Sequence, residues 1–215
     1  FNNLKVRQAI NYAMDRQLMA EQIIPGLGYV EPYILGRNDL GYSDYTPYTY
    51  DPAKAKRMLK EAGYGNGLNV GFMMINREPD IQIAPVVQSY LAEIGIITTI
   101  ETLDRLIYVD KAKTGNFDIS MAQGSLPQPV PLLFMQSQLA SDGPVNRAAW
   151  NNPEFDRTLS ELAQALDPKE QIRLTQKTQR LVLDDAGQTF LFNAANYDGM
   201  STKLRGLQYQ HEGAW

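Results

Sequence analysis

Cysteine is absent from the 215-residue sequence, and histidine occurs once, as His211 near the C-terminus. The lack of cysteine excludes thiol catalysis and thiolate metal sites, and it is compatible with an oxidising compartment as well as with the cytosol. A lone histidine without a nucleophile motif provides neither a catalytic triad nor a histidine-rich metal site. We therefore expect no catalytic residues, no metal and no cofactor.

Long apolar runs and an excess of basic residues are also missing. The apolar run at 68–75 is too short to span a membrane. The formal net charge of −4 provides no basic surface for nucleic acid. No signal peptide is present, and the sequence starts at Phe1, with a helix expected within three residues. We therefore expect a fragment or processed product whose N-terminal part is missing.

An alternation of strand and helix patterns occupies residues 68–126. Apolar or β-branched stretches at 68–75, 96–100 and 117–121 predict three strands. The helical patterns between them end at Gly95 and Gly115, since glycine commonly terminates a helix. Such an alternation is typical of an α/β fold with a mostly parallel sheet flanked by helices. A sheet of this kind binds ligands beyond the carboxyl ends of its strands.

The N-terminal quarter predicts one helix and one long loop. The helix begins after Asn3, ends at Pro25 and carries Lys5 and Arg7 in its first turn, where the helix dipole disfavours cations, so solvent or an acidic neighbour must compensate. Its apolar face is formed by Val6, Ile10, Ala13, Met14 and Leu18. Residues 25–50 form either a packed loop or one whose tyrosines contact a ligand; these are Tyr29, Tyr33, Tyr42, Tyr45, Tyr48 and Tyr50.

Three later helices are predicted from their caps. Asp51-Pro52 and Asn152-Pro153 each combine a capping side chain with proline at the first helical position. Asp167 and Glu170 have the spacing of a capping box. Leu166 is expected on the apolar face of the second helix, residues 190–192 as a short strand, and the pair Asp184-Asp185 on a solvated face.

Five short motifs resemble those of the family 5 extracellular solute-binding proteins, the peptide, nickel and oligosaccharide receptors of ABC importers. Residues 6–16 (VRQAINYAMDR) resemble the helix that opens the second lobe of these proteins. The other motifs follow in the family's order and are found at 50–64, 91–96, 115–118 and 152–156. The resemblance covers nearly the whole chain.

The resemblance implies a periplasmic-binding-protein-like lobe that spans residues 1–215, with 196–215 as a tail toward a missing first lobe. It implies an exported, periplasmic or extracellular protein that captures a small solute, either peptide-like, an oligosaccharide or a conjugate. Two lobes close on the solute by a hinge, and the protein delivers it to an ABC-transporter permease. It implies no enzyme, no nucleic acid and no membrane contact except through the transporter.

Candidate ligand contacts lie after the predicted strands. Arg77 follows the first strand and is either half of a surface salt bridge or a fork for an anionic group of the ligand, and peptide-binding family members carry an arginine at this place. The resemblance also assigns Asn146 and Trp150 to an asparagine and an aromatic position of the family. After the third strand, the candidates are Gln123, Gly124, Ser125, Leu126 and Gln128.

The loop at 123–128 departs from the family pattern. Ser125 stands where many members have tryptophan, and no acidic residue occurs between Asp118 and Asp142. In many family members an aspartate a few residues after the glycine holds the free amino group of the ligand. A buried ammonium ion needs a counter-charge. We therefore expect neutral hydrogen-bonding groups, rather than a free amine, beside this loop.

Two other functions remain open on the residues alone. An α/β transferase or hydrolase would use the same crevice, but it needs an activated nucleophile or a paired acid and base, which the sequence does not supply. A transporter-independent receptor or sensor would share the binding fold, and its genomic neighbourhood would distinguish it.

Overall fold

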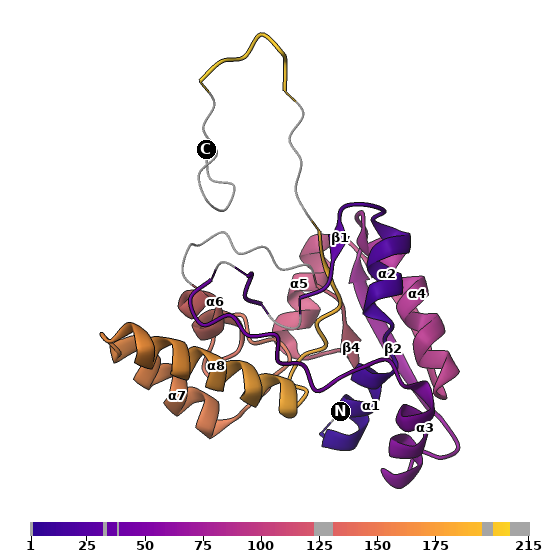
Figure 1. Ribbon diagram of the computed structural model, residues 1–215. Coiled ribbons are helices and arrows are strands. Elements are labelled where there is room, and N and C mark those ends of the chain that lie inside the picture. The colour runs from indigo at the N-terminus through magenta and orange to yellow at the C-terminus, as the bar shows by residue number, and fades with distance from the viewer. Residues whose placement is uncertain (1, 32–33, 38, 123–130, 195–199, 207–215) are drawn as a thin grey trace.

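The computed structural model describes residues 2–31, 34–37, 39–122, 131–194 and 200–206 (Figure 1). Its helices are α1 Leu4–Tyr12, α2 Arg16–Ile23, α3 Pro52–Glu61, α4 Asp80–Glu93, α5 Arg105–Thr114, α6 Pro131–Gln138, α7 Pro153–Gln164 and α8 Pro168–Asp184. Its strands are β1 Gly28–Tyr29, β2 Leu68–Ile75, β3 Ile96–Leu103, β4 Ile119–Ser120 and β5 Asn193–Ala194. Within the described ranges, no helix has the length and apolar character needed to cross a membrane.

A parallel three-stranded sheet in the order β3-β2-β4 confirms the predicted α/β class. Strands β2 and β3 pair along their whole length, from Leu68 opposite Ile96 to Ile75 opposite Leu103. Strand β4 is shorter than the predicted 117–121. Its neighbour Asp118 accepts a hydrogen bond from the Gly71 amide through Oδ2 (2.8 Å), so a side chain replaces the next backbone pair.

Helices cover both faces of the sheet, as alternation of β2 side chains requires. Phe72 and Met74 point into the largest core, which they share with residues of α1, α3 and α4. Met73 and Ile75 point the other way, against Tyr108 and its neighbours on α5. The last four residues of β2 are therefore all buried, so the carboxyl end of the strand lies next to well-packed core.

The predicted N-terminal helix is in fact two helices. Asn3 caps α1 as expected, but α1 stops at Tyr12, and Asp15 starts α2 by accepting a hydrogen bond from the Leu18 amide (3.0 Å). Because α2 has a new direction, Leu18 is 40% exposed and does not belong to the apolar face. Acidic neighbours do compensate the cations of α1, as expected: Lys5 pairs with Glu61 and Arg7 with Asp185, each at 2.8 Å.

A second body packs beside the sheet and consists of α6, α7 and α8 (Figure 1). Asn152 and Asp167 cap α7 and α8 as predicted, but Glu170 pairs with Arg173 instead of closing a capping box. Helix α7 ends at Gln164, which leaves Leu166 93% exposed, so its assignment to the apolar face was wrong. This body has its own core, formed by Leu35, Met135, Leu139, Ala140, Trp150, Phe155, Leu159, Leu162, Leu174 and Val182.

The predicted strand at 190–192 is also wrong. The pairing starts one residue later, where Asn193 and Ala194 form β5 and pair antiparallel with Tyr29 and Gly28 of β1. Phe190 instead packs against the core of the second body. The apolar character of this residue therefore reflects packing in a core and not strand pairing.

Asp184 is exposed, as predicted, whereas Asp185 is only partly exposed and its carboxylate makes contacts within the protein, which corrects its assignment to a solvated face. Asp185 accepts hydrogen bonds from Arg7 on α1 (Nη2–Oδ1, 2.8 Å) and from the indole of Trp150 (Nε1–Oδ2, 2.6 Å). Asp184 accepts one from the Tyr45 hydroxyl. Adjacent helical positions point apart, and here each position reaches a different neighbour. Asp185 thereby joins the second body to α1.

Replacing Asp185 with asparagine removes the charge that holds Arg7 and Trp150 together. We expect Asp185→Asn to lower the free energy of unfolding by about 1–3 kcal/mol, measured by urea denaturation of the full-length protein. Asp110→Asn, an exposed carboxylate on α5, is the matched control and should change little. Equal midpoints for the two variants would contradict the joining role of Asp185.

Candidate functional site

The carboxyl end of β2 carries the strongest candidate for a ligand contact. The Asn76 amide extends the ladder to the Leu103 carbonyl (2.8 Å), and Arg77 follows directly. Nε of Arg77 donates to Oδ2 of Asp80 at 3.0 Å. The Asp80 side chain is fully buried in the first turn of α4, whereas the Arg77 side chain is 37% exposed. A carboxylate from inside the lobe therefore fixes an arginine at the sheet edge.

The salt bridge leaves the outer edge of the Arg77 guanidinium available. Asp80 takes the Nε–H, and within the described residues the Arg77 side chain makes no other hydrogen bond. The two Nη nitrogens are the pair that binds a carboxylate or phosphate with parallel hydrogen bonds. Arg77 can thus form the salt bridge through Nε and still bind an anionic group through its two Nη nitrogens. The two interpretations of Arg77 from the sequence are therefore compatible.

A buried phenol lies at the neighbouring strand end. Tyr108 of α5 is 1% exposed, and its hydroxyl donates to the Met121 carbonyl just after β4 (3.0 Å). Burial raises the pKa of Tyr108, with a smaller contribution in the same direction from Asp80, while Arg147 and Arg77 act to lower it. The phenol therefore stays protonated.

Asn146 and Trp150 lie in the loop before α7, which is held in place by side-chain hydrogen bonds. The Asn146 amide donates to the carbonyls of Ala140 (3.0 Å) and Trp150 (2.7 Å) and accepts from the Trp150 amide. The Trp150 ring is 7% exposed and packs edge-on against Phe155. A Cβ on Gly187 would lie 2.8 Å from this ring, so only glycine fits there. These contacts are structural, and direct ligand contact by either residue stays a prediction.

The remaining predicted site residues are Gln123, Gly124, Ser125, Leu126 and Gln128, and they lie outside the described residues. In the part of the chain that the structure describes, no group of three or more histidine, aspartate or glutamate side chains is arranged to hold a metal ion.

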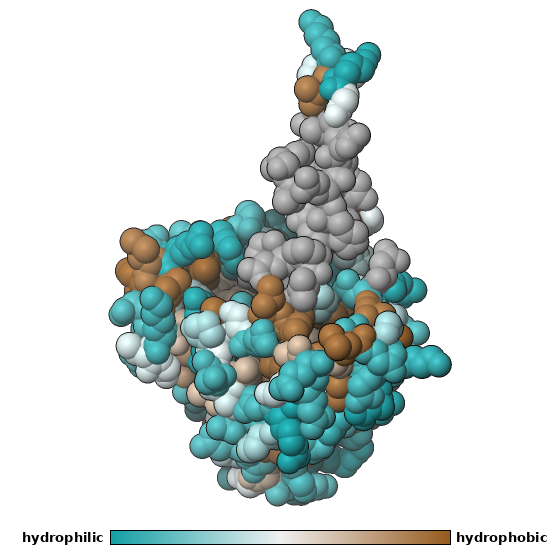
Figure 2. All heavy atoms as spheres, turned by 90° about the vertical axis from the view of Figure 1, so that its left-hand side faces the viewer, coloured by the Kyte–Doolittle hydropathy of each residue, from teal (hydrophilic) through white to brown (hydrophobic). Residues whose placement is uncertain are grey.

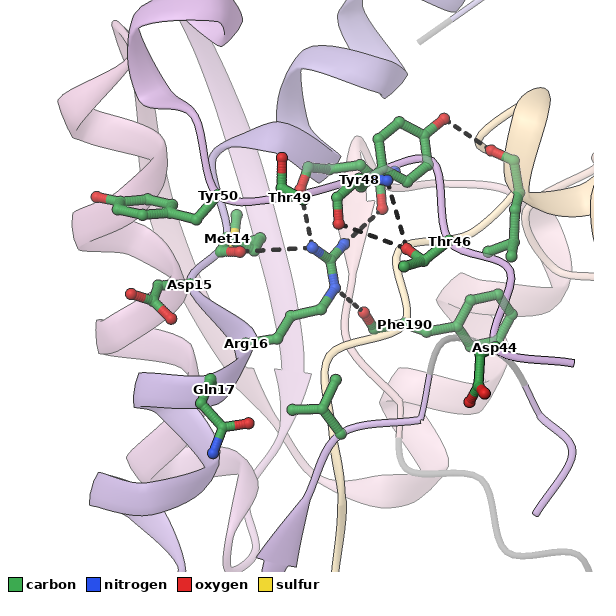
Figure 3. Close-up of a pocket in the computed structure, with 13 residues that line it drawn as sticks. Met14, Asp15, Arg16, Gln17, Asp44, Thr46, Tyr48, Thr49, Tyr50 and Phe190 are labelled. Carbon is green, nitrogen blue, oxygen red and sulfur yellow. Dashed lines mark hydrogen bonds between the residues drawn. The ribbon is translucent and has the colours of Figure 1, made fainter. Parts of the chain in front are cut away.

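A cavity of about 420 Å³ lies where α1, α2, the 44–50 segment and residues 183–190 meet (Figure 3). Arg16 occupies its centre and donates through Nε to the Phe190 carbonyl (2.6 Å), through Nη1 to the Asn11 carbonyl (2.9 Å) and through Nη2 to Asn11 Oδ1 (2.7 Å). Burial lowers the pKa of Arg16 to about 10, so the group is still charged at neutral pH. Arg16 holds chain segments together and presents no fork to a ligand.

Sequence reasoning missed Arg16 because the apolar pattern runs unbroken from Val6 to Leu18 and hides the junction at 13–15. The tyrosines around this cavity also form contacts with the protein. The Tyr48 hydroxyl donates to the Leu183 carbonyl (2.7 Å), and that of Tyr50 to Glu93 (3.2 Å). Contacts of this kind support the packed-loop interpretation of residues 25–50.

A comparison with family models matches residues 1–146 to the middle region of the bacterial extracellular solute-binding proteins, family 5. The chain belongs to this family. The predicted resemblance is thereby confirmed, and the family 5 motif at 6–16 corresponds to α1, the α1–α2 junction and Arg16.

Relatives of this family 5 chain include heme-binding protein A of Haemophilus influenzae, 31% identical over 96% of the chain and 39% of the relative. The glutathione-binding protein GsiB of Salmonella paratyphi A is 30% identical over 85% of the chain and 38% of its own length. The periplasmic binding protein DppA of Helicobacter pylori, associated with an ABC transporter and solved with the peptide STSA, superposes with a TM-score of 0.79 at 29% identity, over 89% of the chain and 38% of DppA.

The chain thus spans about two fifths of the length of these relatives. The superposition confirms the predicted periplasmic-binding-protein-like lobe. The family and these relatives are binding proteins rather than enzymes, as the sequence predicted.

Arg16→Lys tests the role assigned to this half-buried arginine of the family 5 lobe. Lysine keeps the charge but cannot donate in one plane to the Phe190 carbonyl and to both Asn11 oxygens. We expect a loss of about 2–3 kcal/mol of unfolding free energy, measured by urea denaturation of the full-length protein. Arg57→Lys, at an exposed position on α3, is the control, and a loss of the same size there would refute the assignment.

Proposed function

We propose that this chain is the second lobe of a solute-binding protein that serves an ABC importer. The protein captures a small solute between two lobes and delivers it to the permease. The observation that carries the proposal is the Arg77–Asp80 pair at the carboxyl end of β2, where a fully buried carboxylate fixes a partly exposed arginine in a family of binding proteins. Open α/β sheets bind their ligands at this edge.

The length and the surface of the chain support a partner lobe. Relatives are more than twice as long. Residues 200–206 lie well away from the body of the lobe and are all exposed, including Met200 (45%) and Leu204 (50%) (Figure 1). Figure 2 shows that hydrophobic side chains on the face it presents gather mainly in the upper half of the body, on the side from which this segment rises. A first lobe contacting that side would bury them.

The relatives indicate the class of solute and the compartment. They are named for heme, glutathione and a peptide complex, and each of these ligands carries at least one carboxylate. An arginine with an available fork suits such a group. The DppA relative is named as periplasmic, so we place this protein in the periplasm as well. An α/β enzyme in the same crevice has no support from the family.

Arg77 variants of the full-length protein test the proposed function. If Arg77 forks an anionic group, Arg77→Lys should weaken binding nearly as much as Arg77→Ala, because lysine cannot form two parallel hydrogen bonds. The loss should be about 2–5 kcal/mol for a contact that is buried on closure. Solutes are found by thermal shift, and their affinities are then measured by calorimetry. Unchanged affinity in both variants would reduce Arg77 to a structural residue.

The sequence of the 123–128 segment contains no charged residue, and this allows a second test of the proposed function. We expect the full-length protein to prefer solutes without a free amine beside this segment, because an unpaired buried ammonium costs several kcal/mol. Competition binding should compare free-amine di- to pentapeptides with their acetylated forms and with oligosaccharides. If free-amine peptides bind best and acetylation abolishes binding, the expectation is wrong.

A further inference from the structure

Arg77 is held in place by its main chain as well as by its side chain. Its amide donates to the Ile75 carbonyl (2.9 Å), and its carbonyl accepts a hydrogen bond from the Ile81 amide in the first turn of α4 (3.2 Å). The side chain reaches Asp80 through Nε (3.0 Å). Because Arg77 is hydrogen-bonded through its amide, its carbonyl and its side chain, its guanidinium is oriented before a solute arrives, which lowers the entropy lost on binding.

Asp80 is the buried partner of this pair. Its side chain has no exposed surface, whereas that of Arg77 is 37% exposed. Asp80 is also the first residue of α4, where the positive end of the helix dipole stabilises a negative charge. Water and salt screen a buried charge much less than an exposed one. The negative charge of Asp80 therefore acts on any group that binds the exposed side of the Arg77 guanidinium.

The shape of the Arg77 fork alone does not separate a carboxylate from a phosphate, because the two Nη nitrogens can bind either group with parallel hydrogen bonds. The two groups differ in charge. A carboxylate carries one negative charge, and a phosphate monoester carries close to two at neutral pH. Arg77 and Asp80 together have no net charge. A second negative charge on the solute would therefore lose its hydration on burial without meeting a counter-charge in this pair.

The segments that follow β2 and β3 add no net positive charge. The two strand ends lie side by side, because the Asn76 amide donates to the Leu103 carbonyl (2.8 Å). The residues at 76–80 and 104–105 include two arginines and three acidic residues. The described chain directly beyond both strands thus carries more negative than positive charge, which disfavours a doubly charged group at this edge of the sheet.

We propose that Asp80 is a positioning residue that makes the Arg77 contact selective for a single carboxylate over a phosphate or phosphonate. This inference rests on the proposed function and narrows its solute class to solutes that present a carboxylate to Arg77. Asp80 takes the Nε–H, leaves both Nη nitrogens for the solute and cancels the net charge of the pair. Because it is fully buried, Asp80 does not itself contact the solute.

A matched pair of blocked tripeptides tests this selectivity in the full-length protein. The probes are acetyl-Ala-Ala-Ala and the analogue in which a phosphonate replaces the terminal carboxylate, at a pH of about 8.5, where the phosphonate is mostly a dianion. Calorimetry of the natural protein should show the carboxylate bound about tenfold or more tightly than the phosphonate. Equal or tighter binding of the phosphonate, or binding of neither probe, would overturn the inference.

Asp80→Asn should reduce the preference for the carboxylate about tenfold or more. Asparagine has nearly the same shape and keeps an acceptor oxygen for Nε, but it removes the charge. Glu78→Gln, which removes an exposed carboxylate next to Arg77 in the sequence, is the matched control and should keep the preference. The preference is a ratio of two affinities of one protein, so a general loss of stability does not change it.

A ratio that Asp80→Asn leaves unchanged, or that Glu78→Gln lowers equally, would refute the assignment of selectivity to Asp80. If Arg77→Lys still weakens the binding of a solute found by thermal shift, the proposed function stands and only the inference fails. A full-length protein that binds no small solute would refute both.

Discussion

The Asp185 carboxylate fixes how the two halves of this lobe fit together. It accepts a hydrogen bond from Arg7 on α1 and another from the Trp150 indole, which belongs to the core of the α6–α8 body. Arg16 adds a further link, because its guanidinium donates to the Asn11 carbonyl at the end of α1 and to the Phe190 carbonyl after α8. These contacts together hold the two bodies in one arrangement.

Most of the fold could be predicted because its signals are local. Glycines at 95 and 115, the caps Asp51 and Asn152, and the apolar run at 68–75 each act within a few residues of themselves. The failures share a different cause. The contact of Asp185 with Arg7 on α1 and the contact of Arg16 with the Phe190 carbonyl each join residues more than 170 positions apart. Trp150, the other partner of Asp185, lies 35 positions from it. A pattern read along the chain contains no information on such pairs.

The candidate site was predictable to the same extent. Arg77 could be found because it directly follows a strand whose end the sequence predicts. Its partner Asp80 could not, since an aspartate at the start of a helix is typical of an exposed first turn, and nothing local indicates that this one is fully buried.

The pairing of Arg77 with Asp80 also sets what the site can bind. Burying a carboxylate is costly unless a cation and hydrogen bonds compensate it, so Asp80 keeps Arg77 oriented before any solute arrives. That orientation reduces the entropy lost on binding, but it also cancels part of the positive charge that the solute meets. A site with Arg77 alone is therefore close to neutral and favours geometry over charge.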